Sequence, residues 1–167
     1  MDEKNFLKDV SILRDLDEAE LLTFSGIVRP LQVPRGTSIL KEGETGDTMY
    51  ILEEGTVEVS KALTWMAGTE DSPSRDKILS TLSASNHAIF GEVALFEQNS
   101  RTATVVALSN CRLLEVTKSD FLRLAEENPR LGYKITRNIA ELLCSRLRKT
   151  NEDTMKLTTA LSLALSR

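Results

Sequence analysis

The feature that most constrains this fold is a hydrophobic period that changes twice along the chain. Up to Ile27, apolar residues recur at spacings of three and four, which is typical of amphipathic helices. From Val28 the spacing falls to two, and turn residues such as Pro34-Arg35-Gly36 separate short runs, which indicates strands. At Thr117 the helical spacing returns. A chain with this pattern should fold as a β domain held between two helical segments.

We therefore predict an α+β fold, a jelly-roll-like β-roll with short N-terminal helices and a long C-terminal helix. The N-terminal helices are expected at residues 1–27, the roll at 28–117 and the C-terminal helices at 118–167. A break between two C-terminal helices is expected at Asn128-Pro129, since proline suits the first turn of a helix. Residues 62–76, rich in turn formers, are expected to form an exposed loop.

The composition excludes several classes of function. With 21 basic and 25 acidic residues the net charge is −4, which repels polyphosphate and argues against a nucleic-acid partner. The one histidine, His87, excludes a three-histidine metal site, and two cysteines are too few for a four-thiolate centre, so no metal is expected. No apolar run approaches the roughly 20 residues of a membrane span. We therefore expect a cytoplasmic protein with reduced thiols and no membrane partner.

The apolar stripe of the C-terminal segment predicts a homodimer. A helix from Pro129 to Asn151 would be roughly 35 Å long, more than one face of a small roll needs. Part of the stripe is therefore expected to pack on a second copy of the chain. The alternative is a stripe that packs wholly within one chain. The predicted seam consists of Ile135, Ile139, Leu142 and Leu147.

The segment from Phe90 to Val105 carries the chemistry. Gly91 lets the backbone approach a ligand, the apolar residues after it can form one helical turn with free N–H groups, and Arg101 supplies a cation. These features suit a phosphate. Glu92 would repel a phosphate, but its carboxylate is a good acceptor for a sugar hydroxyl. Together Glu92 and Arg101 suggest a nucleotide's ribose and phosphate.

These residues carry a family resemblance. Phe90-Gly91-Glu92-Val93-Ala94-Leu95 and Ser100-Arg101-Thr102-Ala103-Thr104-Val105 resemble the phosphate-binding cassette of cyclic nucleotide-binding domains, found in cyclic nucleotide-dependent kinases, gated channels and the catabolite activator protein. Upstream turns and strands from Pro34 onward are similar to that family in the same order. The resemblance covers Leu16 to Asp153. One departure is Asn86-His87-Ala88-Ile89, where the family often has Gly-Asp.

The resemblance implies a role for each site residue. Glu92 would accept the ribose 2′-hydroxyl and Arg101 would pair with the cyclic phosphate. The sugar-phosphate pocket would be lined by the backbone of Gly91, Val93, Ala94, Thr102 and Ala103. Val57 and Leu79 would supply apolar wall. Thr150 would lie against the base and Asn151 at the same base, from the same chain or its partner.

Two features give opposite indications of the preferred base. Thr102 directly after Arg101 resembles cGMP-preferring domains, whereas Thr150-Asn151 resembles the bacterial cAMP pocket. Because an asparagine amide can make two hydrogen bonds to adenine, cAMP is favoured over cGMP. Arg146, Arg148 and Lys149 just before this pair are expected on a solvated helix face, the alternative being a basic patch.

The implied function is a regulatory sensor in which cAMP or cGMP binding rearranges the C-terminal helices for an unknown effector. No catalysis is expected, because no cluster combines a nucleophile, a base and an orienting group. Bacterial activators continue into a helix-turn-helix domain, for which the segment after Asn151 is too short. The alternative is a dimeric adaptor roll that has lost its ligand, with Glu92 and Arg101 paired to each other.

Overall fold

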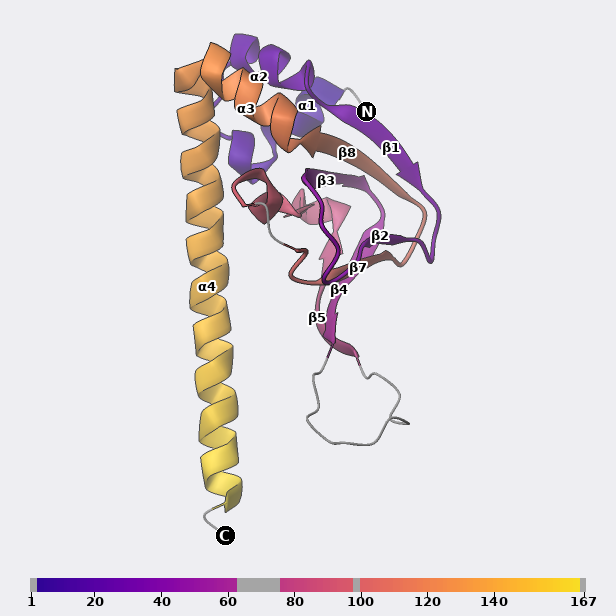
Figure 1. The fold of residues 1–167 in the computed structure, drawn as a ribbon, viewed down its shortest axis with the longest axis vertical. Helices are drawn as coiled ribbons and strands as arrows, with labels where there is room; N and C mark the ends of the chain where they lie inside the picture. The colour runs from indigo at the N-terminus through magenta and orange to yellow at the C-terminus, as the bar shows by residue number, and fades with distance from the viewer. Residues whose placement is uncertain (1–2, 63–75, 98–99, 166–167) are drawn as a thin grey trace.

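The fold is a β-roll covered by helices on one side, seen in a computed structural model that describes residues 3–62, 76–97 and 100–165 (Figure 1). The predicted loop at 62–76 lies almost wholly outside these residues. Within them two four-stranded antiparallel sheets and the flanking helices form the predicted α+β jelly-roll-like fold, which is thereby confirmed.

The two sheets combine strands from distant parts of the sequence. The first has the order β1 (Arg29–Val33), β8 (Cys111–Thr117), β3 (Thr48–Glu54) and β6 (Ile89–Phe90). The second has the order β2 (Ser38–Leu40), β7 (Thr104–Ala107), β4 (Thr56–Ala62) and β5 (Asp76–Ser83). Strand β7 begins only at Thr104, and Ser100 before it pairs with Thr45 in an isolated bridge. Thr102 and Ala103 therefore lie in a loop.

Strand β3 faces two separate cores. Met49 and Ile51 pack among the helices, whereas Tyr50 and Leu52 point into the space between the sheets. This division follows from the alternation of side chains along a strand. The first sheet is thus the middle layer between the helices and the second sheet.

Short helices close the outer face of the first sheet. These are α1 (Glu3–Lys8), the single-turn η1 (Ser11–Leu13) and α2 (Glu18–Ser25). The start of α2 is fixed by a capping box, in which Glu20 N–H donates to the Asp17 carboxylate and Asp17 N–H donates to the Glu20 carboxylate, each at 2.9 Å. Two further single turns, η2 (Ala84–Asn86) and η3 (Glu92–Leu95), flank β6.

The C-terminal helices are α3 (Lys118–Glu127) and α4 (Pro129–Leu165). The predicted break at Asn128-Pro129 is confirmed. The two helices touch closely where α4 starts, since a Cβ on Gly132 would lie 2.5 Å from Cβ of Ala125. Helix α4 has 37 residues, and its C-terminal half extends far past the covering helices (Figure 1). Within the described residues, no helix combines the length and apolar character needed to cross a membrane.

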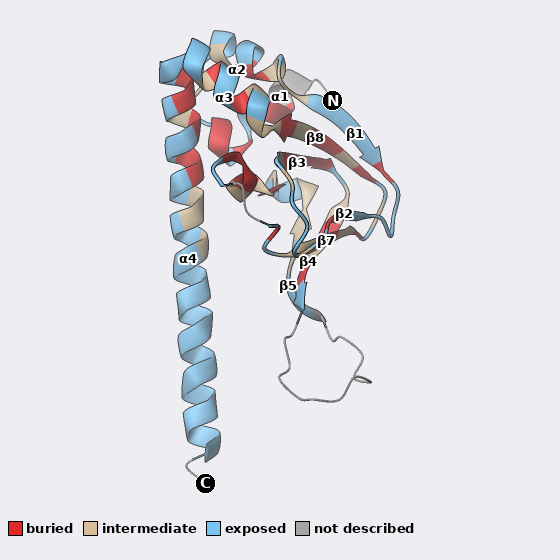
Figure 2. Ribbon diagram, viewed as in Figure 1, coloured by how far each residue is buried: buried red, intermediate tan, exposed pale blue. Residues whose placement is uncertain are grey.

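The predicted dimer seam needs correction. Ile135 and Ile139 are fully buried in the chain's own core, and Leu142 packs against that core as well. Only Leu147 of the four predicted residues is well exposed, at 61%. The reason is that the first part of α4 covers the first sheet's core, whereas the described residues from Leu147 onward are all exposed (Figure 2).

Candidate functional site

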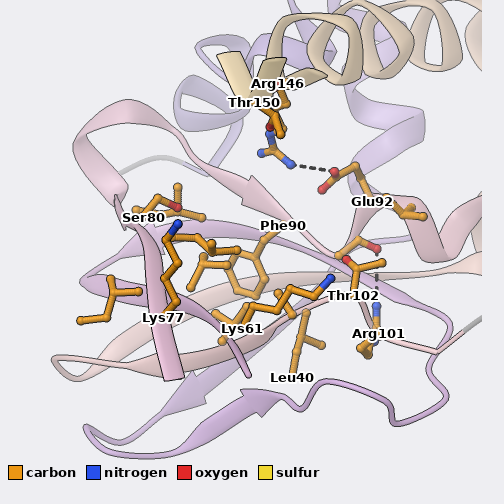
Figure 3. A pocket seen from close by; sticks show the side chains of 18 of the residues that line it. Leu40, Lys61, Lys77, Ser80, Phe90, Glu92, Arg101, Thr102, Arg146 and Thr150 are labelled. Carbon is orange, nitrogen blue, oxygen red and sulfur yellow. Dashed lines mark hydrogen bonds and ion pairs between the residues drawn. The ribbon is translucent and has the colours of Figure 1, made fainter. Parts of the chain in front are cut away.

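A cavity of about 800 Å³ lies between the β-roll and α4 (Figure 3). One wall is the β4–β5 pair, another is α4, and the floor is formed by the cassette around η3 and the loop before β7. Leu40, Phe90 and Val105 give the interior an apolar surface. The volume lies within the range of small-molecule sites.

Most of the predicted site residues meet in this cavity. Those that line it are Gly91, Glu92, Val93, Ala94, Arg101, Thr102, Ala103, Leu79 and Thr150. Val57 does not, since it is fully buried in the core between the sheets, and Val59, two residues further along the same face, lines the cavity instead. Asn151 is exposed and outside the lining, because it projects about 100° around α4 from Thr150.

Arg101 is a buried cation at one end of the cavity, with 9% of its surface exposed. Its Nη1 donates to the backbone oxygen of Thr48 and its Nη2 to Oγ1 of Thr48, both at 2.8 Å. Among the residues that the structure describes, no carboxylate forms an ion pair with it. Burial lowers the pKa of Arg101, and the negative charges of Tyr50 and Asp47 when ionised act in the opposite direction. A guanidinium held in this way is suited to an anionic ligand.

Two glycines leave room for this guanidinium. Gly91 has a φ of +77°, which favours glycine, and a Cβ there would lie 2.8 Å from the Thr48 oxygen and 3.1 Å from Nη1 of Arg101. At Gly46 a Cβ would lie 2.6 Å from Nε of Arg101. A side chain at Gly46 or Gly91 would therefore crowd the guanidinium of Arg101.

Glu92 is a buried carboxylate, 3% exposed, at the start of η3. Its Oε1 accepts a hydrogen bond from Nη1 of Arg146 at 2.6 Å, and Nη2 of Arg146 donates to the Ile89 oxygen at 2.7 Å (Figure 3). Its Oε2 is buried with no hydrogen-bond partner in the described part of the chain. A buried oxygen of this kind needs a hydrogen-bond donor, and a hydroxyl group of a ligand can provide one.

Arg146 is a candidate site residue that sequence reasoning missed. It was expected on a solvated helix face, but it reaches from α4 to the cavity floor and pairs with Glu92. The available signal was its spacing, since Arg146 precedes Thr150 by four residues and such residues share a helix face. The adaptor alternative expected Glu92 to pair with Arg101, but in the structure Glu92 pairs with Arg146.

The cavity therefore joins three recognition elements. A buried guanidinium can take an anion, an unpaired carboxylate oxygen can take a hydroxyl, and an apolar wall can take a flat ring. Among the residues described, no three His, Cys, Asp or Glu side chains are grouped to hold a metal ion. These elements match the sugar, phosphate and base of a nucleotide, and together with the roll they define a nucleotide-sensing class of domain.

Comparison with known proteins identifies the family. The Cyclic nucleotide-binding domain family matches residues 30–128, and the chain belongs to it. The cAMP-dependent protein kinase regulatory subunit of Dictyostelium discoideum is 31% identical over 121 residues, 72% of this chain and 35% of that protein. The cGMP-dependent protein kinase, isozyme 1, of Drosophila melanogaster is 33% identical over 121 residues, 72% of this chain and 15% of that protein.

Among solved structures, the Thermus thermophilus catabolite activator protein is similar with a TM-score of 0.73 and 25% identity. The match covers 89% of this chain and 63% of that chain. The chain spans well under half the length of each of the two curated relatives above. The relationship therefore places the domain in its family, and its ligand and partners are matters for proposal.

Proposed function

We propose that this protein binds a cyclic nucleotide in the cavity beside α4 and acts as a regulatory sensor. One observation carries the proposal. The same cavity holds a buried guanidinium at Arg101 that no described carboxylate pairs with and a buried carboxylate oxygen of Glu92 that no described group donates to. A cyclic phosphate on a ribose bears both missing partners.

In the proposed pose the cyclic phosphate lies at Arg101 and along the backbone of the cassette. The ribose 2′-hydroxyl donates to Oε2 of Glu92. The base then lies toward α4, against Thr150 and the apolar wall that includes Leu40. Thr102 and Ala103, in the loop before β7, complete the floor under the phosphate.

Ligand binding is coupled to α4 through Arg146. The arginine holds Glu92 from the helix side, so a ribose hydroxyl on the same carboxylate changes the environment of the ion pair. A ligand shifts the helix only if it binds one arrangement of α4 better than another. The part of α4 after Arg146 is exposed in the described chain and is therefore free to respond.

Among cyclic mononucleotides we propose that cAMP is preferred over cGMP. The support is the position of Thr150 in the cavity wall. In the proposed dimer, Asn151 of the second copy supplies the amide that makes two hydrogen bonds to adenine. Thr102 also lines the cavity and gives cGMP its own contact. The preference for cAMP over cGMP therefore depends on whether the Asn151 contact to adenine is stronger than the Thr102 contact to guanine.

We further propose a homodimer through the exposed half of α4. Leu147, Thr154 and Leu161 recur every seven residues, as do Thr150 and Leu157, which is the spacing of a two-stranded coiled coil. Leu147, Leu157 and Leu161 are 59–61% exposed within one chain. A second copy along this stripe covers them and brings the partner's Asn151 toward the site.

The function is tested by calorimetry of the whole chain with cAMP, cGMP and the non-cyclic nucleotide 5′-AMP. We expect binding of the cyclic nucleotides, a raised melting temperature with each, and little effect of 5′-AMP. We also expect the cyclic nucleotide to be recovered unchanged, because the proposed role is sensing and not conversion. An absence of binding by both cyclic nucleotides would favour the adaptor alternative.

A further inference from the structure

We propose that Lys61 and Lys77 form a second anion subsite in the cavity, which takes a second phosphate on the nucleotide. This inference rests on the proposed function and extends its ligand. The class of ligand it points to is a nucleotide with two phosphates, of which the cyclic dinucleotides are the example we test.

The register of the second sheet places the two lysines together. Lys61 on β4 and Lys77 on β5 are direct cross-strand partners, and both line the cavity. In Figure 3 the side chain of Lys61 extends toward Thr102 and that of Lys77 toward Ser80. Like charges at directly opposed positions destabilise a strand pair. A phosphate bound at this wall, within reach of either ammonium group, offsets the repulsion between the two positive charges.

Few acidic groups are placed to neutralise these lysines. Among the described residues, the ion pair that involves Lys61 is with Glu42 at 3.9 Å, and none involves Lys77. The cavity lining carries five cationic and three acidic side chains, although the chain as a whole has a net charge of −4. Apart from the Glu92–Arg146 pair, the lining keeps four cations, of which Arg101, Lys61 and Lys77 lie on the β-roll side, against two acids, Glu97 and Asp153.

The cavity is large enough for a ligand with two phosphates. Its volume of about 800 Å³ lies in the upper part of the range for small-molecule sites. Arg101 is at the cassette end, while Lys77 is on β5, the edge strand of the second sheet. The cations are therefore distributed over two walls, which suits two separate phosphates.

The test is calorimetry with cAMP, cGMP, cyclic di-AMP and cyclic di-GMP on the full chain and on the double variant Lys61→Met/Lys77→Met. Methionine keeps an unbranched side chain and removes the charge. The matched control is Lys8→Met, an exposed lysine on α1 outside the cavity lining. Circular dichroism and thermal melting check that each variant folds.

We expect at least one cyclic dinucleotide to bind the native chain about ten-fold tighter than the corresponding mononucleotide, a difference of about 1.4 kcal/mol. The double variant should lose that advantage and keep its mononucleotide affinity within about three-fold, and Lys8→Met should change neither. Equal or weaker dinucleotide binding by a chain that binds cAMP or cGMP overturns the subsite but leaves the proposed function intact. An equal loss for all ligands also overturns it, since the lysines then act by general attraction. Failure of every cyclic nucleotide to bind refutes the proposed function itself.

Discussion

Glu92 and Arg146 join the cassette to the C-terminal helix through an ion pair of 2.6 Å across 54 positions of sequence. The carboxylate is almost wholly buried, whereas the arginine side chain is 41% exposed. One oxygen of Glu92 faces the helix and the other is buried without a donor in the described part of the chain. The Glu92 side chain thus holds α4 through one oxygen and offers the other oxygen to the cavity.

The ion pair should be measurable in the ligand-free protein by a double-mutant cycle of Glu92→Gln and Arg146→Met. We expect a coupling energy of about 0.5–3 kcal/mol in urea unfolding. The value should lie in the lower half of that range, because water screens the exposed side of the arginine. Arg148→Met, on the exposed side of the same helix, is the control and should change stability little. Additive effects of the two substitutions would show that the pair is not coupled.

Arg101→Ala should lower cyclic nucleotide affinity by roughly 2–5 kcal/mol, because the phosphate would then be buried without its cation. Glu92→Gln should cost less, on the order of 1–3 kcal/mol, because the single amide oxygen can accept from Arg146 or from the ribose hydroxyl but not from both, so one hydrogen bond is lost while the phosphate keeps its cation. Calorimetry on folded variants compares the two. If Glu92→Gln were the more damaging change, the roles assigned to phosphate and ribose would be wrong.

The ratio of cAMP affinity to cGMP affinity should fall with one substitution and rise with another. Asn151→Ala should reduce cAMP affinity by roughly 1–3 kcal/mol and leave cGMP less affected, because two coplanar hydrogen bonds to adenine are lost. Thr102→Ala should reduce cGMP affinity more than cAMP affinity. Parallel titrations with both nucleotides measure this. Tighter cGMP binding by the native chain that collapses in Thr102→Ala would reverse the proposed preference.

A substitution in the exposed part of α4 should abolish the proposed dimer without unfolding the chain. Leu161→Glu places a charge on the exposed stripe of α4 and should give a folded monomer in analytical ultracentrifugation at micromolar concentration. Ile139→Glu should instead destabilise the chain itself, because that side chain is fully buried in the core. A native chain that sediments as a monomer over this range would remove the proposed interface.

Stability should fall in acid partly through Glu20. Its carboxylate accepts a hydrogen bond from Lys134 at 2.6 Å, and this bond, followed by the one from Asp17 N–H, lowers the pKa of Glu20, while burial and the Asp17 charge oppose the shift. A lowered pKa in the folded state stabilises the protein above the ordinary value for glutamate, about 4.3, and this contribution is lost as the pH falls further. The stability difference between the native chain and Glu20→Gln should therefore shrink below that pH. A difference that is constant with pH would contradict this account.

The local patterns of the sequence predicted the elements well. The two-residue period marked the strands, and Asn128-Pro129 marked the break between α3 and α4. The cassette residues could be assigned because they resemble the phosphate-binding cassette of cyclic nucleotide-binding domains, and they do line the cavity. These features depend on neighbours in the sequence.

Contacts between distant segments could not be predicted in the same way. Ile135 and Ile139 have the spacing of either a core stripe or a seam, and only the position of η1 and the first sheet buries them. Arg146 looked like a surface residue because its partner Glu92 is 54 positions away. The register of β4 with β5 brings Lys61 and Lys77 to the same wall of the cavity.

Because α4 continues well beyond Arg146, a small tilt of the helix at that residue produces a large displacement at its C-terminal end. From Arg146 to Leu165 the axis runs about 28 Å, so a tilt of about 10° at the ion pair moves the far end by about 5 Å. A rearrangement at Glu92 that is small on the scale of a hydrogen bond would therefore arrive at the end of the helix as a displacement of about one helical turn. In the proposed sensor, the exposed half of α4 would amplify events in the cavity by its length alone.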